Sequence, residues 1–125
     1  MPALIRVTFA ALLAVLVSLA HAGSLPPIAK AEIEAVLTGL KSSGCQFNRN
    51  GTWYSGADAQ AHLTKKLEYL ANKNQIESAE EFIALGASTS SVSGKPYQVR
   101  CGASPAVDSK LWLQDQLKAV RAAKP

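Results

Sequence analysis

The feature that most constrains the fold is a pair of cysteines far apart in the chain. Cys45 and Cys101 are the only two in the sequence. In an oxidising compartment such an isolated pair is usually joined as a disulfide. The bridge would close a loop of roughly 60 residues and stabilise the fold by about 4 kcal/mol through the entropy of the unfolded chain. A redox pair is the alternative, but the C-x-x-C spacing typical of redox pairs is absent.

The start of the chain predicts export into such a compartment. Residues 1–22 carry one basic residue, an apolar run from Val7 to Ala20, and Ala20-His21-Ala22 as an A-x-A cleavage signal. This is the pattern of a secretory signal peptide. A membrane anchor is the alternative, but the apolar run of about 14 residues is shorter than the roughly 20 that span a bilayer. We therefore expect cleavage before Gly23 and no membrane association afterwards.

The remaining chain has the size of one domain and a mild positive charge. Cleavage leaves 103 of the 125 residues and removes Arg6, so 12 basic and 9 acidic residues remain and the net charge falls from +4 to +3. That excess suits an anionic partner but is too small and too scattered for nucleic acid. We expect a mobile leader at 23–27 and a single domain at 28–122.

Apolar residues recur at helical spacing in four segments. In the first, Ile33, Val36, Leu37 and Leu40 form one stripe. Ser55 or Gly56 can cap the second helix, and Ser78 with Glu81 forms a capping box before the third. We expect the third to bury Phe82, Ile83 and Leu85. The predicted helices are Ile28–Lys41, Ala57–Ala71, Ala79–Ala87, and a last one that Asp108 or Ser109 can cap and that ends at about Arg121.

The stretch CQFNRNGTWY predicts a β-hairpin. Asn50-Gly51 is the preferred pair for a type I′ turn, because both positions need positive φ. Alternation then places Cys45, Phe47 and Tyr54 on the core face. PYQVRC predicts a third strand that the disulfide ties to the hairpin. The fold class is therefore α+β, with four helices packed against one face of a small, mostly antiparallel three-stranded sheet.

Most signatures of enzymes are absent from the sequence. There is no phosphate loop, no dinucleotide fingerprint and no G-x-S-x-G elbow. His62 is the only histidine that remains after signal cleavage, and both cysteines are assigned to the disulfide. A metal site built on several histidine or cysteine ligands is thereby excluded, and we expect no cofactor.

One candidate site centres on His62 and Lys66, which lie four residues apart on the second helix. Both flank its leucine stripe, at the boundary between core and water, where a pocket rim would lie. The nearby ammonium would hold His62 neutral, free to act as acceptor or base. The alternative is a boundary histidine bonded to a loop carbonyl, with the Lys66 stem covering the core.

Two further features allow a functional or a structural interpretation. The serine-rich segment Ser88–Gly94 would offer hydroxyls and N–H groups to an anion or a sugar, or it would be an ordinary polar turn. Trp53, on the outer face of the hairpin, would stack on a sugar or a partner, or it would pack under Trp112 or the first helix.

The segments SGCQFNRNGTWY, AHLTKKLEYL, SAEEFIALGASTSSVSGKPYQVRCG and WLQDQL together resemble the YfeK-like family of small exported proteobacterial proteins, a domain of unknown function. The resemblance covers about Ile33 to Leu117 and implies a periplasmic location but no activity. Thr89 stands where relatives carry a basic residue. The family pattern falls on Asn50, Gly51, Tyr54, His62, Leu63, Lys66, Ser88, Ser90, Ser91, Ser93, Gly94, Pro96, Tyr97, Trp112 and Leu113.

These observations favour a small binding or interaction module over an enzyme, with an anionic or sugar-like envelope ligand and no nucleic acid partner. The alternatives are a small hydrolase that uses His62 as base and an inhibitor of a periplasmic protein such as a lysozyme. The sequence does not define the oligomeric state. The candidate ligand-binding residues are Arg49, Asn50, Tyr54, His62, Lys66, Ser90, Ser91, Ser93 and Tyr97.

Overall fold

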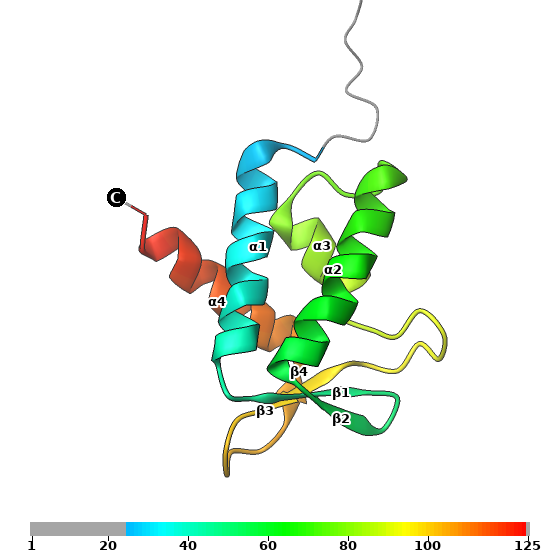
Figure 1. Ribbon diagram of the computed structural model, residues 1–125, viewed down its shortest axis with the longest axis vertical. Helices are drawn as coiled ribbons and strands as arrows, with labels where there is room; N and C mark the ends of the chain where they lie inside the picture. The colour runs from blue at the N-terminus through cyan, green and yellow to red at the C-terminus, as the bar shows by residue number, and fades with distance from the viewer. Residues whose placement is uncertain (1–24, 125) are drawn as a thin grey trace, which may run out of the picture.

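A computed structural model describes residues 25–124. The predicted signal peptide and its cleavage site therefore lie outside the described residues. Within them the chain forms four helices and four strands, in an α+β arrangement (Figure 1). In chain order these are α1 Pro27–Ser42, β1 Gln46–Arg49, β2 Thr52–Ser55, α2 Gly56–Asn72, α3 Ala79–Gly86, β3 Gln98–Arg100, β4 Val107–Asp108 and α4 Ser109–Ala122.

The hairpin forms as its turn residues predict. Asn50 and Gly51 both have positive φ, at 53° and 86°. They join β1 to β2 in a register that pairs Phe47 with Tyr54 and Arg49 with Thr52. Strand β3 adds to the other side of β1, also antiparallel. The predicted hairpin and the third strand are thus confirmed.

The prediction of three strands is wrong, because a fourth completes the sheet in the order β2-β1-β3-β4. Strand β4 pairs antiparallel with β3 through Val107 and Asp108. With only two residues, both exposed, it is too short to carry the alternating pattern by which a strand is recognised. It is held by the antiparallel ladder to β3, which local sequence does not encode.

The helices lie on one side of the sheet, and their apolar stripes meet its inner face (Figure 1). Leu40 of α1, Leu63 of α2 and Leu113 of α4 are fully buried. The sheet contributes Phe47 and Val99, and Tyr97 directly precedes β3; each is at most 2% exposed. Burial of this many large apolar side chains is the dominant stabilising contribution in a domain of this size.

Two side chains expected in the core lie nearer the solvent. Leu85 of α3 is 55% exposed, because this eight-residue helix buries only the side that carries Phe82 and Ile83. Tyr54 shares the face of Phe47 but is only half-buried, because β2 is the edge strand of the sheet. Both residues line hollows at the surface of the molecule.

Helix caps and one glycine fix how the helices join. The Ser55 hydroxyl accepts the Asp58 N–H and caps α2, and the Ser78 hydroxyl accepts the Glu81 N–H and caps α3, both as predicted. Gly56 follows directly against α1, where a Cβ would stand 2.4 Å from the backbone oxygen of Leu40. Any larger residue at position 56 would push α1 and α2 apart.

The start of α4 differs from the expected capping. Asp108 is the N-cap residue, but its side chain makes no capping hydrogen bond. The hydroxyl of the fully buried Ser109 instead donates to the backbone oxygen of Ala87 at 2.6 Å. This bond satisfies a buried carbonyl and ties α4 to the end of α3.

The predicted disulfide between Cys45 and Cys101 is confirmed, with an S–S distance of 2.05 Å. It joins the residue before β1 to the residue after β3. It therefore fixes the hairpin against the strand that begins next to Tyr97. A disulfide is typical of proteins in oxidising compartments, so the bond fits an exported protein.

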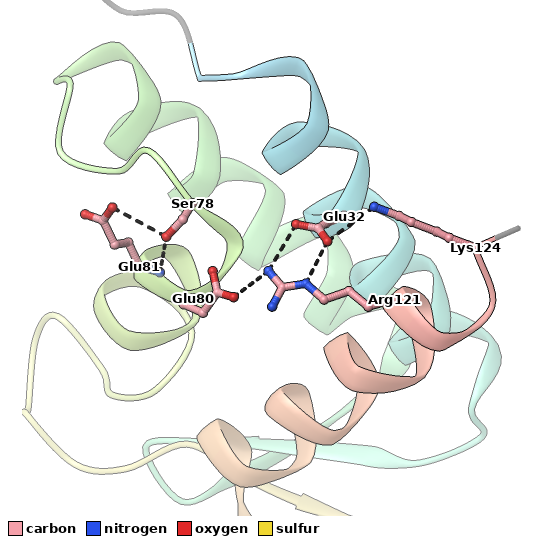
Figure 2. Close-up of polar contacts among 6 residues, drawn as sticks. All are labelled: Glu32, Ser78, Glu80, Glu81, Arg121 and Lys124. Atoms are coloured by element: carbon pink, nitrogen blue, oxygen red, sulfur yellow. Dashed lines mark hydrogen bonds and ion pairs between the residues drawn. The ribbon is translucent and has the colours of Figure 1, made fainter.

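A cluster of charged residues links the three helices α1, α3 and α4 (Figure 2). Arg121 donates to Glu32 of α1 at 2.8 Å and forms an ion pair with Glu80 of α3, and Lys124 also reaches Glu32. We call Glu32, Glu80, Arg121 and Lys124 the paired cluster. Among the helices of residues 25–124, none is both long and apolar enough to cross a membrane.

Candidate functional site

The hairpin, α2 and the serine-rich loop after α3 meet at one edge of the molecule (Figure 1). There they surround a hollow of about 390 Å³, which we call the cationic hollow. Eight of the nine predicted site residues line it, and the ninth, Ser93, bonds to one of them. Its lining residues are Arg49, Asn50, Thr52, Tyr54, His62, Lys66, Ser90, Ser91, Val92 and Tyr97.

The serine-rich loop is ordered by its own hydrogen bonds. The buried Ser90 hydroxyl accepts the N–H groups of Val92 and Ser93, and Thr89 pairs with Pro96 across the base of the loop. The Ser93 hydroxyl donates to Oδ1 of Asn50, 43 residues away, at 2.5 Å. The loop is thereby tied to the hairpin turn, and its N–H groups near Ser90 serve the loop rather than an open nest.

Arg49 and His62 are in direct contact across the hollow. Nη1 of Arg49 lies 2.6 Å from Nδ1 of His62, and its guanidinium stacks over the Tyr54 ring. A guanidinium only donates, so Nδ1 of His62 must accept. The neutral ring then carries its hydrogen on Nε2, which faces the hydroxyl of Tyr97 at 3.3 Å. Both ring nitrogens of His62 are therefore engaged.

Tyr97 contacts both His62 and Lys66 and joins them to the core. Its ring is 2% exposed and packs against Phe47, with centroids 4.9 Å apart. Its hydroxyl oxygen accepts a hydrogen bond from Lys66 Nζ at 3.1 Å and another from Nε2 of His62. Since both neighbours donate, the tyrosine's own hydrogen is left to donate into the hollow. Lys66 also donates to the backbone oxygen of Thr89 at 3.2 Å.

Burial and like charges oppose protonation in this cluster. Burial lowers the pKa of His62, and the positive charges of Arg49, Lys66 and Lys65 lower it further. Burial, followed by the charge of Arg49, likewise lowers the pKa of Lys66. The imidazole is thus held neutral, as the sequence predicts from the ammonium of Lys66. The larger cause is burial, and the charge of Arg49 lowers the pKa of His62 more than the charge of Lys66 does.

The lining of the cationic hollow contains no carboxylate. Within residues 25–124 neither Arg49 nor Lys66 forms an ion pair, and both donate only to neutral acceptors.

Two further hollows open beside His62. One of about 270 Å³ lies towards Asp58, and one of about 360 Å³ lies towards Tyr69 and Leu85. We call the cluster of Arg49, His62, Lys66 and Tyr97 the cationic cluster.

The sequence-based selection missed four contributors. Thr52 and Val92 line the hollow, Lys65 lines the neighbouring ones, and the backbone oxygen of Thr89 holds Lys66. The hairpin register, which sets Thr52 opposite Arg49, would have identified the first. Nothing in the local sequence marks the other three, because their roles depend on how the loop docks on α2.

Trp53 lies on the outer face of the sheet, away from the hollow. Its ring is covered by the Arg100 guanidinium, 3.9 Å from the centroid, which Gln46 holds through a 2.8 Å bond to Arg100 Nε. This cation–π contact is the ring contact that the structure gives Trp53, and whether the ring also stacks on a sugar or a partner stays a prediction. A search of the described part of the chain finds no group of three or more potential metal ligands.

Comparison with known proteins identifies relatives but no activity. The chain is 41% identical over 69 residues to the uncharacterized protein YfeK of Salmonella typhimurium, which is 54% of this chain and 56% of that relative. The alignment thus spans little more than half of the relative's length. No solved structure matches the chain. The model of a family of unknown function, DUF5329, matches residues 27–121, so the chain belongs to that family.

Proposed function

We propose that this protein is a periplasmic binding module for an anionic ligand of the cell envelope, which it holds in the cationic hollow. One observation carries the proposal: Arg49 and Lys66 face a hollow without a carboxylate and donate only to neutral acceptors. An anion there would meet N–H and O–H donors and would relieve the repulsion between the two cations.

The donor set also explains which ligand groups the site would prefer. Arg49 has a planar fork of donors suited to carboxylate or phosphate oxygens, and Lys66 adds a compact charge. The Tyr97 hydroxyl supplies a third donor from the floor of the hollow. A neutral sugar would satisfy the hydroxyl but would leave the cations without a countercharge, so an acidic sugar or another anion fits better.

The test is a binding titration followed by NMR of the exported chain, with inorganic phosphate, acetate, N-acetylmuramic acid and glucose as probes. We expect the three anions to shift the amide signals of the hairpin turn and the serine-rich loop. Lys66→Met should weaken their binding about tenfold or more, since a charge-assisted bond is lost. Lys118→Met, an exposed lysine on α4, is the matched control. Equal binding by both variants would refute the proposal.

A second candidate, an inhibitor that blocks a periplasmic enzyme such as a lysozyme, has one observation in its favour. Val92 is 93% exposed at the tip of the serine-rich loop, which its own hydrogen bonds hold in shape. A stoichiometric complex weakened by Val92→Asp would support this role. The hydrolase alternative has no such support: in the described part of the chain, the hydrogen bonds of His62 go to Arg49 and Tyr97 and not to a serine hydroxyl.

A further inference from the structure

The cationic hollow continues into an apolar groove along α2. The groove has a volume of about 360 Å³ and shares His62, Lys66 and Ser91 with the hollow. Its remaining lining is Lys65, Tyr69, Leu70 and Leu85. Lys66 therefore stands at the junction, with its ammonium in the hollow beside Tyr97 and its stem beside the groove.

Two of the side chains that line the groove expose apolar surface to water. Tyr69 is 60% exposed and Leu85 is 55% exposed, although they come from neighbouring helices α2 and α3. Tyr69 follows Lys66 by three residues and Leu70 by four, so both lie one turn further along the same side of α2. The groove thus leads from the cations towards exposed apolar surface in one direction.

A larger hollow lacks this combination. It has a volume of about 670 Å³, lies between α1 and α2, and is lined by charges of both signs, including Lys30, Glu34 and Glu68. The outer face of the sheet offers a tryptophan, but Arg100 covers its ring. Beside His62, in contrast, a cationic hollow without a carboxylate in its lining joins an open apolar groove.

We propose that the ligand is a single-chain amphiphile, with a phosphate or carboxylate head group in the cationic hollow and its alkyl chain in the groove. This inference rests on the proposed function and specifies its ligand class. The head group is held by Arg49, Lys66 and the Tyr97 hydroxyl. The alkyl chain covers Tyr69 and Leu85, whose exposed apolar surface is thereby removed from water. Charge complementarity at one end and apolar contact at the other fix the direction in which the ligand lies.

The test is a chain-length series of alkyl phosphates and of alkyl carboxylates, from methyl to octyl, each below the concentration of micelle formation. We expect affinity to rise about two- to fourfold for each added CH₂, which reflects burial of the chain. The two series also distinguish the head groups. Octyl glucoside, which has the chain without the charge, should bind at least about tenfold more weakly than octyl phosphate.

Substitution in the groove sharpens the test. Leu85→Ser should weaken octyl phosphate about three- to tenfold and leave inorganic phosphate unchanged, because Leu85 lines the groove and not the hollow. Leu111→Ser is the matched control, since Leu111 is 58% exposed on α4. Thermal melting of both variants checks their fold.

Each outcome separates the two proposals. Binding of short anions without any gain from chain length would overturn the amphiphile and leave the anion site standing. Binding of octyl glucoside as tight as octyl phosphate would overturn the anionic head group. Failure of every anion to bind would overturn both.

Discussion

The paired cluster and the cationic cluster differ in how the charges within them are balanced. In the paired cluster, the Arg121 hydrogen bond, with Lys124 nearby, lowers the pKa of Glu32, and Glu32 and Glu80 raise the pKa of Arg121 (Figure 2). In the cationic cluster, burial and like charges lower the pKa of both His62 and Lys66. The first region is electrostatically satisfied within the fold, whereas the second holds repulsion that a bound anion would relieve.

This contrast is the physical basis for the proposal that the cationic cluster, and not the paired cluster, binds a ligand. Stable surface charges in a folded domain are usually paired or solvated, as in the paired cluster. Half-buried cations that face one another without a carboxylate cost stability, and such costs tend to occur at functional sites. The comparison is therefore the main physical argument for a site beside His62.

The largest expected effect comes from the disulfide, which ties the hairpin to β3. Replacing Cys45 and Cys101 together by serine should lower the free energy of unfolding by about 4 kcal/mol, because the link closes a 56-residue separation. Urea denaturation measures this change. A loss below about 1 kcal/mol would mean that the sheet holds the hairpin and the loop together without the link.

Removing one charge from each region should have unequal effects on stability. Glu32→Gln leaves Arg121 and Lys124 without their shared partner, so the melting temperature should fall by a few degrees. Lys66→Met removes a repelled cation whose stem covers apolar surface, so the melting temperature should stay equal or rise. Calorimetry of both variants measures the two melting temperatures. A fall for Lys66→Met as large as that for Glu32→Gln would reverse the comparison.

The two regions should also lose stability in different pH ranges. The folded pKa of His62 lies below the ordinary value of 6.5, so the unfolded chain takes up the proton first and stability falls as the pH drops below about 6.5. Glu32 has a folded pKa below 4.5, so its contribution is present above pH 4.5 and is lost as the pH falls further.

Substitution of His62 or of Glu32 shows which residue causes the loss of stability in each pH range. His62→Gln should remove the loss of stability that begins as the pH drops below about 6.5, and Glu32→Gln should reduce the loss below pH 4.5. Urea midpoints measured at several pH values provide the test. An unchanged profile in His62→Gln would show that the imidazole is not held neutral by its surroundings.

The smallest effect concerns the bond that joins the loop to the hairpin. Ser93→Ala removes the donor to Asn50 at an exposed position, so stability should fall by about 1 kcal/mol or less. Hydrogen exchange in the serine-rich loop should nevertheless become faster, because the loop loses its tie to the turn. Unchanged exchange there would show that the internal bonds of the loop are sufficient.

Much of the fold follows from short, local patterns. Asn50-Gly51 fixes the hairpin register, Ser78 with Glu81 starts α3, and the leucine stripe of α2 places His62 and Lys66 at the boundary of the core. These features depend on neighbours in the sequence, so periodicity and capping chemistry identify them.

The remainder depends on contacts between distant segments. Strand β4 has two residues, and Leu85 lies on a helix of about two turns, where a stripe cannot separate the buried side from the exposed one. The bond between Arg49 and His62 requires the hairpin to fold back on α2. The sequence therefore indicated the members of the candidate site but not the partners that set their charges.

The most direct test of the cationic cluster is the pKa of His62 in the presence and absence of saturating sulfate. NMR titration of its imidazole, assigned by loss of the signal in His62→Gln, provides both values. If an anion binds beside Arg49 and Lys66, its charge offsets theirs and the pKa of His62 should rise towards or above 6.5. A pKa that sulfate leaves unchanged, in a protein whose hairpin and loop signals also stay fixed, would contradict the account.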